Sequence, residues 1–221
     1  MDGSPLGGAM RRSHREAVVV RRFAEGDSVS QLTCLLHRAY AAHAAEGRVF
    51  FASYQSVEDT AYRLGKGECW IALRDGELVG TVTVAEPYGA PQGYPAPVDA
   101  GAFWQLAVEP ECREMGLGQR LLALTEERIG ALGSSQVVID TSVQAVEPVG
   151  WYRRRGYVPV DSWRWGVTNY ESIATWRWPR EVKKSRKVER ICVERMVVWP
   201  SRKSRREVGI DHTPSRAENR D

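Results

Sequence analysis

A glycine-containing loop that leads into a helix could bind a phosphate group. Residues 103–122 begin with alternating apolar side chains, which is typical of a strand, and a loop with Gly116 and Gly118 follows. The leucines after this loop recur at helical spacing. The first turn of such a helix has unpaired backbone N–H groups, and the helix dipole adds about half a positive charge there. The segment therefore favours a phosphate ligand, although the same glycines would also suit an ordinary strand–turn–helix corner.

The elements that position this loop follow from the apolar pattern elsewhere. Asp75-Gly76 is a two-residue hairpin signal, and Ser56 with Asp59 has the spacing of a capping box. We expect helices at 28–45, 56–64, 118–132 and 147–156, and strands at 16–23, 68–73, 77–85, 103–108, 136–141, 157–165 and 172–178. The order is then β-α-α-β-β-β-α-β-α-β-β.

Residues 113–118, Arg-Glu-Met-Gly-Leu-Gly, resemble the (Gln/Arg)-x-x-Gly-x-(Gly/Ala) loop of the GNAT superfamily of N-acetyltransferases. The order of elements is similar to that family over residues 16–178. The resemblance implies an α/β fold with a mixed, mostly antiparallel sheet of six to seven strands and about four helices. It assigns residues 15–178 to one N-acetyltransferase domain, leaving 1–14 as a disordered N-terminus and 179–221 as a basic, partly helical or disordered extension.

The resemblance also implies that acetyl-CoA is the co-substrate. A β-bulge at Leu106 to Val108 would pair with the pantetheine arm and face the thioester oxygen, while the loop amides would hold the diphosphate. Glu114 departs from the usual loop, and Ala145 stands where many relatives have Asn, so either Gln144 replaces that contact or it is absent. The implied coenzyme-binding residues are Leu106, Ala107, Val108, Arg113, Glu114, Met115, Gly116, Leu117, Gly118, Gln119, Gln144 and Tyr152.

A second signature, Trp151-Tyr152-Arg-Arg-Arg-Gly-Tyr157, is similar to the family's aromatic-Tyr-x-x-x-Gly-aromatic segment. In that family the tyrosine lies near the coenzyme sulfur and acts as general acid. A phenol suits this role, because its reference pKa of about 10 keeps it protonated at neutral pH. The alternative is that Tyr152 only packs on the sheet beside Trp151.

The general base is less clearly indicated. Glu86 and Asp99 flank the proline-rich segment 87–101, which we expect to be a functional loop, and both are candidate bases. A water chain, or proton loss from the acceptor to bulk water, would serve equally. His37 and His43 fall on the first helix, where they are more typical of surface or packed residues, and no metal-ligand cluster stands out.

Aromatic residues indicate the acceptor. We expect Tyr88 and Trp104 to line the acceptor site, because aromatic faces attract amines. The wider aromatic set is Trp104, Trp151, Trp163, Trp165, Tyr88 and Tyr94, in which Trp163 and Trp165 are better suited to the core. The expected activity is acetyl transfer to a primary amine of a small molecule by direct attack in a ternary complex. The alternatives are a protein lysine or N-terminal acetyltransferase, and a non-catalytic acyl-CoA sensor whose basic tail binds nucleic acid.

Composition limits the partners. The 221 residues are 43% hydrophobic and contain no long apolar run, so no membrane span is expected. Residues 179–221 hold 13 basic and 7 acidic residues, whereas residues 1–178 hold 18 and 21. Nucleic-acid binding is therefore expected, if anywhere, through the tail. The four cysteines lie far apart, which is typical of reduced thiols in a cytoplasmic protein, and a homodimer is compatible with the sequence.

Overall fold

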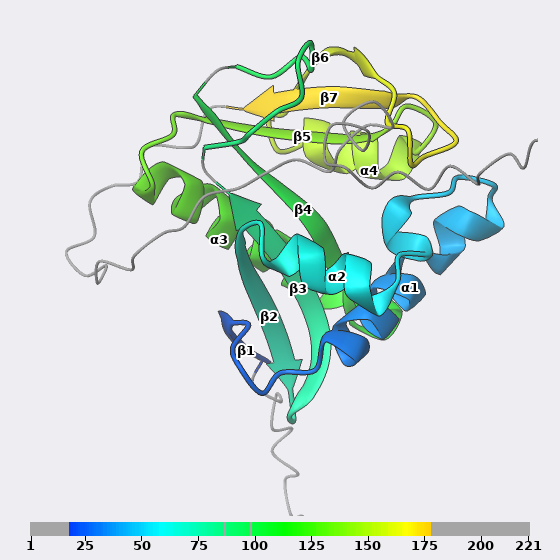
Figure 1. The fold of residues 1–221 in the computed structure, drawn as a ribbon, viewed down its shortest axis with the longest axis vertical. Helices are drawn as coiled ribbons and strands as arrows, with labels where there is room; N and C mark the ends of the chain where they lie inside the picture. The colour runs from blue at the N-terminus through cyan, green and yellow to red at the C-terminus, as the bar shows by residue number, and fades with distance from the viewer. Residues whose placement is uncertain (1–17, 86, 98, 178–221) are drawn as a thin grey trace, which may run out of the picture.

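A computed structural model describes residues 18–85, 87–97 and 99–177, apart from the side chain of Glu114. The expectations for residues 1–14 and 179–221 lie outside the described residues. The described part forms one seven-stranded sheet in the order β1-β2-β3-β4-β5-β7-β6 (Figure 1). The strands are β1 Val18–Arg22, β2 Glu68–Arg74, β3 Glu77–Ala85, β4 Ala100–Val108, β5 Gln136–Ser142, β6 Val158–Trp163 and β7 Ser172–Arg177.

The strand pairing confirms the expected mixed, mostly antiparallel sheet. Every neighbouring pair is antiparallel except β4 and β5, which are parallel. The β2–β3 hairpin turns at Asp75 and Gly76, whose φ angles are 53° and 85°, as a tight two-residue turn requires. One boundary was wrong. Segment 87–101 was expected to be all loop, but β4 begins at Ala100, where it pairs with Gln136.

Helices cover both faces of the sheet. They are α1 Val29–Ala45, α2 Val57–Leu64, α3 Leu117–Ala131 and α4 Val146–Arg153, with 3-10 turns at Phe51–Ser53 and Pro110–Met115. Cys69 and Ile71 of β2 pack against the buried leucines of α1, whereas Ala72 packs against α3. Alternate residues of a strand point to opposite faces, so α1 and α3 lie on opposite sides of the sheet (Figure 1). Within the described residues, no helix is both long and apolar enough to cross a membrane.

The central parallel pair is short. β4 and β5 pair only at Ala100–Gln136, Gly101–Val137 and Ala102–Val138, although both strands continue beyond these pairs. The two strands therefore diverge after Ala102 and Val138. Their diverging ends leave one edge of each strand free of sheet hydrogen bonds, and the cavity described next begins there.

Candidate active site

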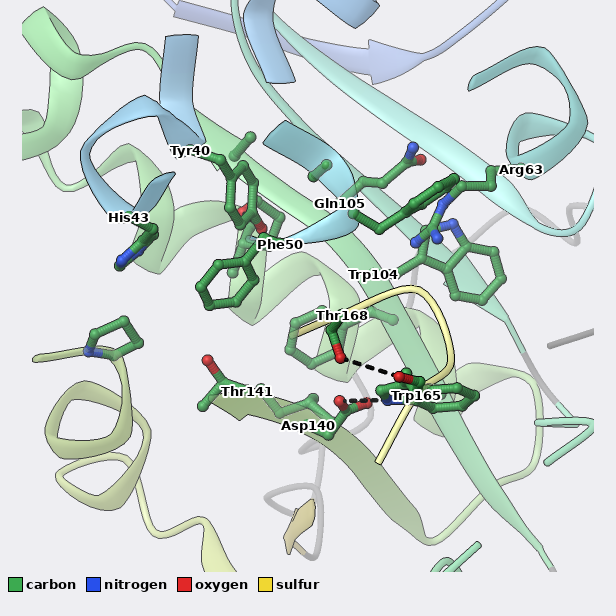
Figure 2. A pocket seen from close by; sticks show the side chains of 18 of the residues that line it. Tyr40, His43, Phe50, Arg63, Trp104, Gln105, Asp140, Thr141, Trp165 and Thr168 are labelled. Carbon is green, nitrogen blue, oxygen red and sulfur yellow. Dashed lines mark hydrogen bonds between the residues drawn. The ribbon is translucent and has the colours of Figure 1, made fainter. Parts of the chain in front are cut away.

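A cavity of about 330 Å³ opens where β4 and β5 diverge. Residues 102–108 of β4 and 138–141 of β5 form two of its walls. Helix α1, the segment through Phe50–Ala52, helix α2 and the loop through residues 165–170 contribute further side chains, and Figure 2 shows side chains converging from these elements. The site thus combines backbone from the sheet with side chains from segments far apart in the sequence.

A bulge in β4 shapes one wall of this cavity. Thr81 pairs with Ala107 and Thr83 pairs with Trp104, so two residues of β4 lie opposite Val82 alone. Those residues are Gln105 and Leu106, and Gln105 has a φ of 54°. The bulge was expected at Leu106 to Val108, but Ala107 and Val108 pair regularly with β3, so its centre is Gln105. Sequence pattern gives little warning of such a position, because glutamine has no special preference for positive φ.

A buried chain of side-chain hydrogen bonds holds Gln105 in this conformation. Thr83 Oγ1 donates to Gln105 Oε1 over 3.2 Å, and Gln105 Nε2 donates to Gln55 Oε1 over 3.3 Å. Gln55 Nε2 then donates to Thr60 Oγ1 over 2.6 Å. Positive φ at a non-glycine residue costs about 1–3 kcal/mol. These three hydrogen bonds offset part of this cost and connect the bulge to the start of α2.

We predict that Gln55→Ala lowers the free energy of unfolding by about 1–3 kcal/mol, because it leaves buried polar partners unsatisfied. Turnover should also fall by about tenfold, since loss of positioning at the bulge carries a rate penalty. Denaturant unfolding and initial rates measure the two effects. The matched control is Thr125→Val, which removes the buried bond from Thr125 Oγ1 to Leu121 O on α3. The control should lose stability and keep its turnover. If Gln55→Ala behaves in the same way, the hydrogen-bond network has no role in the site.

The edge of β4 that faces the cavity presents a backbone donor. Glu109 N donates to Val79 O over 2.9 Å, so Glu109 points toward β3. Successive strand residues point their N–H and C=O groups to opposite edges, so those of Val108 face the cavity. On the same side, the carbonyl of Leu106 accepts a hydrogen bond from Tyr40 Oη over 3.1 Å. The N–H of Val108 is therefore placed to bind a ligand that lies along this edge.

The predicted phosphate loop lies beside the end of β4. Gly116 has a φ of 74° and caps α3, which leaves the amides of Leu117, Gly118 and Gln119 without partners inside the helix. A Cβ on Gly118 would lie 3.7 Å from Val108 Cγ2, so this first turn is adjacent to the cavity wall. The described backbone thus leads from the free edge of β4 to a helix N-terminus that attracts anions.

The other predicted coenzyme residues are only partly brought together. Arg113 lines the cavity, and its Nη2 donates to Ala39 O over 2.5 Å. Met115, Gly116 and Leu117 line a second, small hollow of about 80 Å³. Gly118, Gln119 and Gln144 are absent from the residues that line either space, and Gln144 is exposed. Nothing is described of the Glu114 side chain.

Tyr152 lines the cavity and also packs in the core. Its ring lies 4.9 Å from that of Trp151 and 5.3 Å from that of Tyr157, both edge-on. Burial raises the pKa of Tyr152 above its ordinary value. The phenol therefore keeps its proton at neutral pH, as a general acid must, so the packing and cavity-lining roles coexist.

Asp140 is a residue that sequence reasoning missed. It lies on β5 and is the only carboxylate among the described residues that line the cavity. Trp165 Nε1 donates to its Oδ2 over 2.7 Å, as Figure 2 shows, and Tyr94 Oη donates to its Oδ1 over 3.2 Å. Burial raises the pKa of Asp140, which makes it a stronger base than an ordinary aspartate. The signal available in the sequence is a charged residue directly after the apolar run Val137–Ile139.

The two carboxylates proposed from sequence are not placed at the cavity. Asp99 is exposed and is not among the lining residues, and its backbone carbonyl accepts from Ser134 Oγ. Glu86 lies outside the described residues. His43 lines the cavity but packs 4.8 Å from the ring of Phe50, and burial lowers its pKa. His37 instead bonds Gln55 O over 2.8 Å through its Nε2.

The acceptor residues Tyr88 and Trp104 both line the cavity, together with Tyr94 and Trp165 from the expected aromatic set. Trp165 was better suited to the core by sequence, and it does pack there, yet it also reaches the cavity. The lining contains further aromatic residues, Tyr40, Phe50, Phe51, Tyr62, Phe103 and Tyr170. In the described part of the chain, no three metal-ligating side chains gather in one place.

The part of the sequence that forms most of this cavity matches a known family. Residues 36–157 match the family model described as the acetyltransferase (GNAT) family. The chain belongs to the GNAT acetyltransferase family. The match spans α2, the diverging strands β4 and β5, the loop before α3, and Tyr152, so the family assignment covers most of the elements that form the cavity.

Relatives of this GNAT domain act on different compounds. The chain is 28% identical over 141 residues to S-(2-succino)cysteine N-acetyltransferase of Bacillus subtilis, covering 62% of this chain and 82% of the relative. It is 30% identical over 142 residues to mycothiol acetyltransferase of Cellulomonas flavigena. That match covers 63% of this chain but only 40% of the relative. Family membership thus makes the chain an acyltransferase. The acceptors in these names are those of the relatives.

Solved structures share the fold. The ribosomal-protein-S18-alanine N-acetyltransferase of Escherichia coli superimposes with a TM-score of 0.57 at 13% identity, covering 78% of this chain and 100% of the other. A GNAT acetyltransferase from Elizabethkingia anophelis with acetyl-CoA bound gives a TM-score of 0.53 at 17% identity, covering 73% and 97%. At these identities the likeness establishes the fold.

Proposed function

We propose that this GNAT domain transfers the acetyl group of acetyl-CoA to a primary amine of a small molecule, by direct attack in a ternary complex. The observation that carries the proposal is the cavity between the diverging ends of β4 and β5, with the Tyr152 phenol in its lining. Two relatives, which are named S-(2-succino)cysteine N-acetyltransferase and mycothiol acetyltransferase, support a small acceptor.

The residues present fit a coenzyme A thioester. The free edge of β4 offers the Val108 N–H to an extended pantetheine arm, as an added strand would use it. The first turn of α3 offers the amides of Leu117, Gly118 and Gln119 to a diphosphate. These two sets adjoin each other at Val108 and Gly118. The acyl end of the coenzyme would then lie in the cavity that Tyr152 lines.

The proposed chemistry moves two protons. Asp140 accepts a proton from the acceptor ammonium, which frees the nitrogen lone pair to attack the thioester carbonyl carbon. Backbone N–H groups at the β4 bulge stabilise the oxyanion that forms. When the C–S bond breaks, Tyr152 donates its proton to the leaving thiolate. The second proton of the attacking nitrogen restores the Tyr152 phenol, and Asp140 releases the proton it accepted to water. The products are an N-acetyl amide and coenzyme A, with one proton released overall.

The walls of the cavity favour a small acceptor. Segments from α1, α2 and the loop at 165–170 converge on it, and the ring of Phe50 lies 4.8 Å from that of Tyr170. These contacts link the α1–α2 segment to the β6–β7 loop across the site. A peptide would need a more open groove, so we rank protein acetylation below acetylation of a small amine.

Incubation with acetyl-CoA and a panel of small amines tests the proposal. Free thiol release and the mass of the N-acetyl product should rise together. Acetylation of peptides in preference to every small amine would favour the protein acetyltransferase instead. Coenzyme A binding without acetylation of any amine would favour an acyl-CoA sensor and would contradict the proposed function.

A further inference from the structure

Arg63 is a cation in the cavity that the proposed reaction does not use. It lies in the last turn of α2 and lines the cavity beside Trp104 (Figure 2). Its guanidinium carbon is 5.4 Å from the ring centre of Phe51 and 5.7 Å from that of Trp104. Aromatic faces attract a guanidinium and hold its plane in one orientation. The side chain is therefore positioned, and it is not a mobile surface charge.

No described residue forms an ion pair with Arg63. Its Nε is buried without a hydrogen-bond partner, and so is Nε1 of the neighbouring Trp104. The two carboxylates that interact electrostatically with Arg63 accept hydrogen bonds from other residues. Asp59 accepts from Ser56 N at the start of α2, and Asp140 accepts from Trp165 and Tyr94. Burial lowers the pKa of Arg63 to about 10, so it remains positive at neutral pH.

A desolvated cation without a partner is costly in a folded protein. Such a group is expected where a ligand supplies the missing charge. Of the other cations that line the cavity, Arg113 already donates to Ala39 O, and Lys66 Nζ lies 4.6 Å from the ring centre of Tyr62. Arg63 differs from Lys66 because its Nε is buried without a hydrogen-bond partner. Arg63 is thus the cation best suited to receive an anionic ligand group.

We propose that Arg63, held between Phe51 and Trp104, forms a carboxylate subsite, so that the acceptor is a primary amine that also carries a carboxylate, as an amino acid does. This inference rests on the proposed function and narrows its substrate class. A planar guanidinium matches a carboxylate with two parallel hydrogen bonds. Asp140 supplies the opposite charge on β5, where it suits an ammonium. The cavity therefore carries both charges that a zwitterionic acceptor needs.

Matched acceptors test the subsite. L-phenylalanine and 2-phenylethylamine differ only in the carboxylate, and so do L-methionine and 3-(methylthio)propylamine. We expect the wild-type protein to acetylate the carboxylate-bearing member of each pair with a kcat/KM about 10- to 100-fold higher, through a lower KM. Arg63→Met should reduce this ratio to near one, and Arg63→Lys should restore part of it. Arg153→Met, which removes an exposed cation on α4 that lies outside the cavity, should leave the ratio unchanged.

A binding measurement separates this inference from the proposed function. 3-Phenylpropanoate has the carboxylate but no amine, so it cannot be acetylated. It should bind the wild-type protein in the presence of coenzyme A, as calorimetry would record, and bind Arg63→Met about tenfold or more weakly. Binding of this probe without acetylation of any amine would support the subsite while contradicting the proposed function. Acetylation of amines without binding of this probe would support the proposed function and contradict the subsite.

Stability provides a second readout. Because Arg63→Met removes a half-buried charge that has no ion-pair partner among the described residues, the ligand-free variant should melt at a temperature equal to or higher than the wild type. A variant that melts well below the wild type, with equal losses toward both members of an acceptor pair, would show that Arg63 only supports the fold. Equal kcat/KM of the wild type for both members of each pair would also overturn the proposal.

Discussion

Replacing Tyr152 by phenylalanine is expected to lower kcat by about 100-fold, because loss of a general acid typically costs 10² or more. The substitution removes one oxygen and keeps the ring that packs against Trp151 and Tyr157. Without the phenol, the thiolate must leave unprotonated or take a proton from water. Binding of acetyl-CoA should be almost unaffected. Rapid-mixing or steady-state rates with thiol detection, together with calorimetric titration of coenzyme A, measure the two quantities.

Tyr157→Phe is the matched control for that variant. Tyr157 packs in the same core cluster, and its hydroxyl donates to Glu126 Oε1 over 3.2 Å, but it does not line the cavity. It should lose some stability and keep its kcat. Burial raises the pKa of Tyr152, so the phenol keeps its proton even at a pH equal to the ordinary tyrosine pKa of about 10. Deprotonation of Tyr152 should therefore cause no loss of rate below about pH 10. Equal kcat values for wild type and Tyr152→Phe would remove Tyr152 from the mechanism.

Replacing Asp140 by asparagine is the second large effect, with an expected fall in kcat/KM of about 100-fold at neutral pH. Asparagine has nearly the same shape, so its oxygen can accept from Trp165 while its NH₂ donates to the Tyr94 hydroxyl. Asp140→Asn should therefore keep the packing around residue 140 but lose the ability to accept a proton. The control is Asp161→Asn, which alters an exposed carboxylate on β6 that accepts from Ser162 N.

The pH dependence distinguishes a base from a structural aspartate. In the wild type, kcat/KM should rise with pH through a pKa above the ordinary aspartate value of about 3.9, because burial raises the pKa of Asp140. Asp140→Asn should lack this rise. A raised carboxyl pKa stabilises the fold below the unfolded value and loses that contribution as pH rises through the folded value. At pH 7 the variant should therefore melt at or above the wild-type temperature. Lower stability with an unaltered pH profile would contradict the assignment.

Local signals predicted the fold well. Asp75 and Gly76 marked the hairpin, and Ser56 with Asp59 forms the expected capping box, in which each donates a backbone N–H to the other's side chain. These features depend on residues close in sequence, so short-range chemistry is sufficient to find them. The element order then identified the family, which the family match confirms.

Features that arise from distant contacts were harder to predict. The bulge at Gln105 is held by Gln55 and Thr83, which lie 50 and 22 residues away along the chain. Asp140 follows an apolar run and by pattern alone is an ordinary residue of a strand. It becomes notable only because β4 and β5 diverge beside it. Arg63 similarly matches an exposed helix cation until Phe51 and Trp104 enclose it.

The site also illustrates a conflict between stability and function. Gln105 holds a costly backbone conformation, Arg63 lacks a described ion partner, and the Asp140 carboxyl group is buried enough to raise its pKa. Each feature reduces the stability of the ligand-free protein. Their convergence in one cavity is expected of a binding site, where ligands supply the missing contacts. Arg63→Met and Asp140→Asn should therefore gain stability while losing function.

A coenzyme A thioester is proposed to lie along the free edge of β4 and to reach the first turn of α3. Amide ¹H–¹⁵N spectra recorded with and without coenzyme A would locate it residue by residue. We expect large shifts at the amides of Val108, Leu117, Gly118 and Gln119, with smaller ones at residues that line the cavity. Saturating coenzyme A that leaves these amides unshifted, or that shifts only residues away from β4 and α3, would contradict this placement.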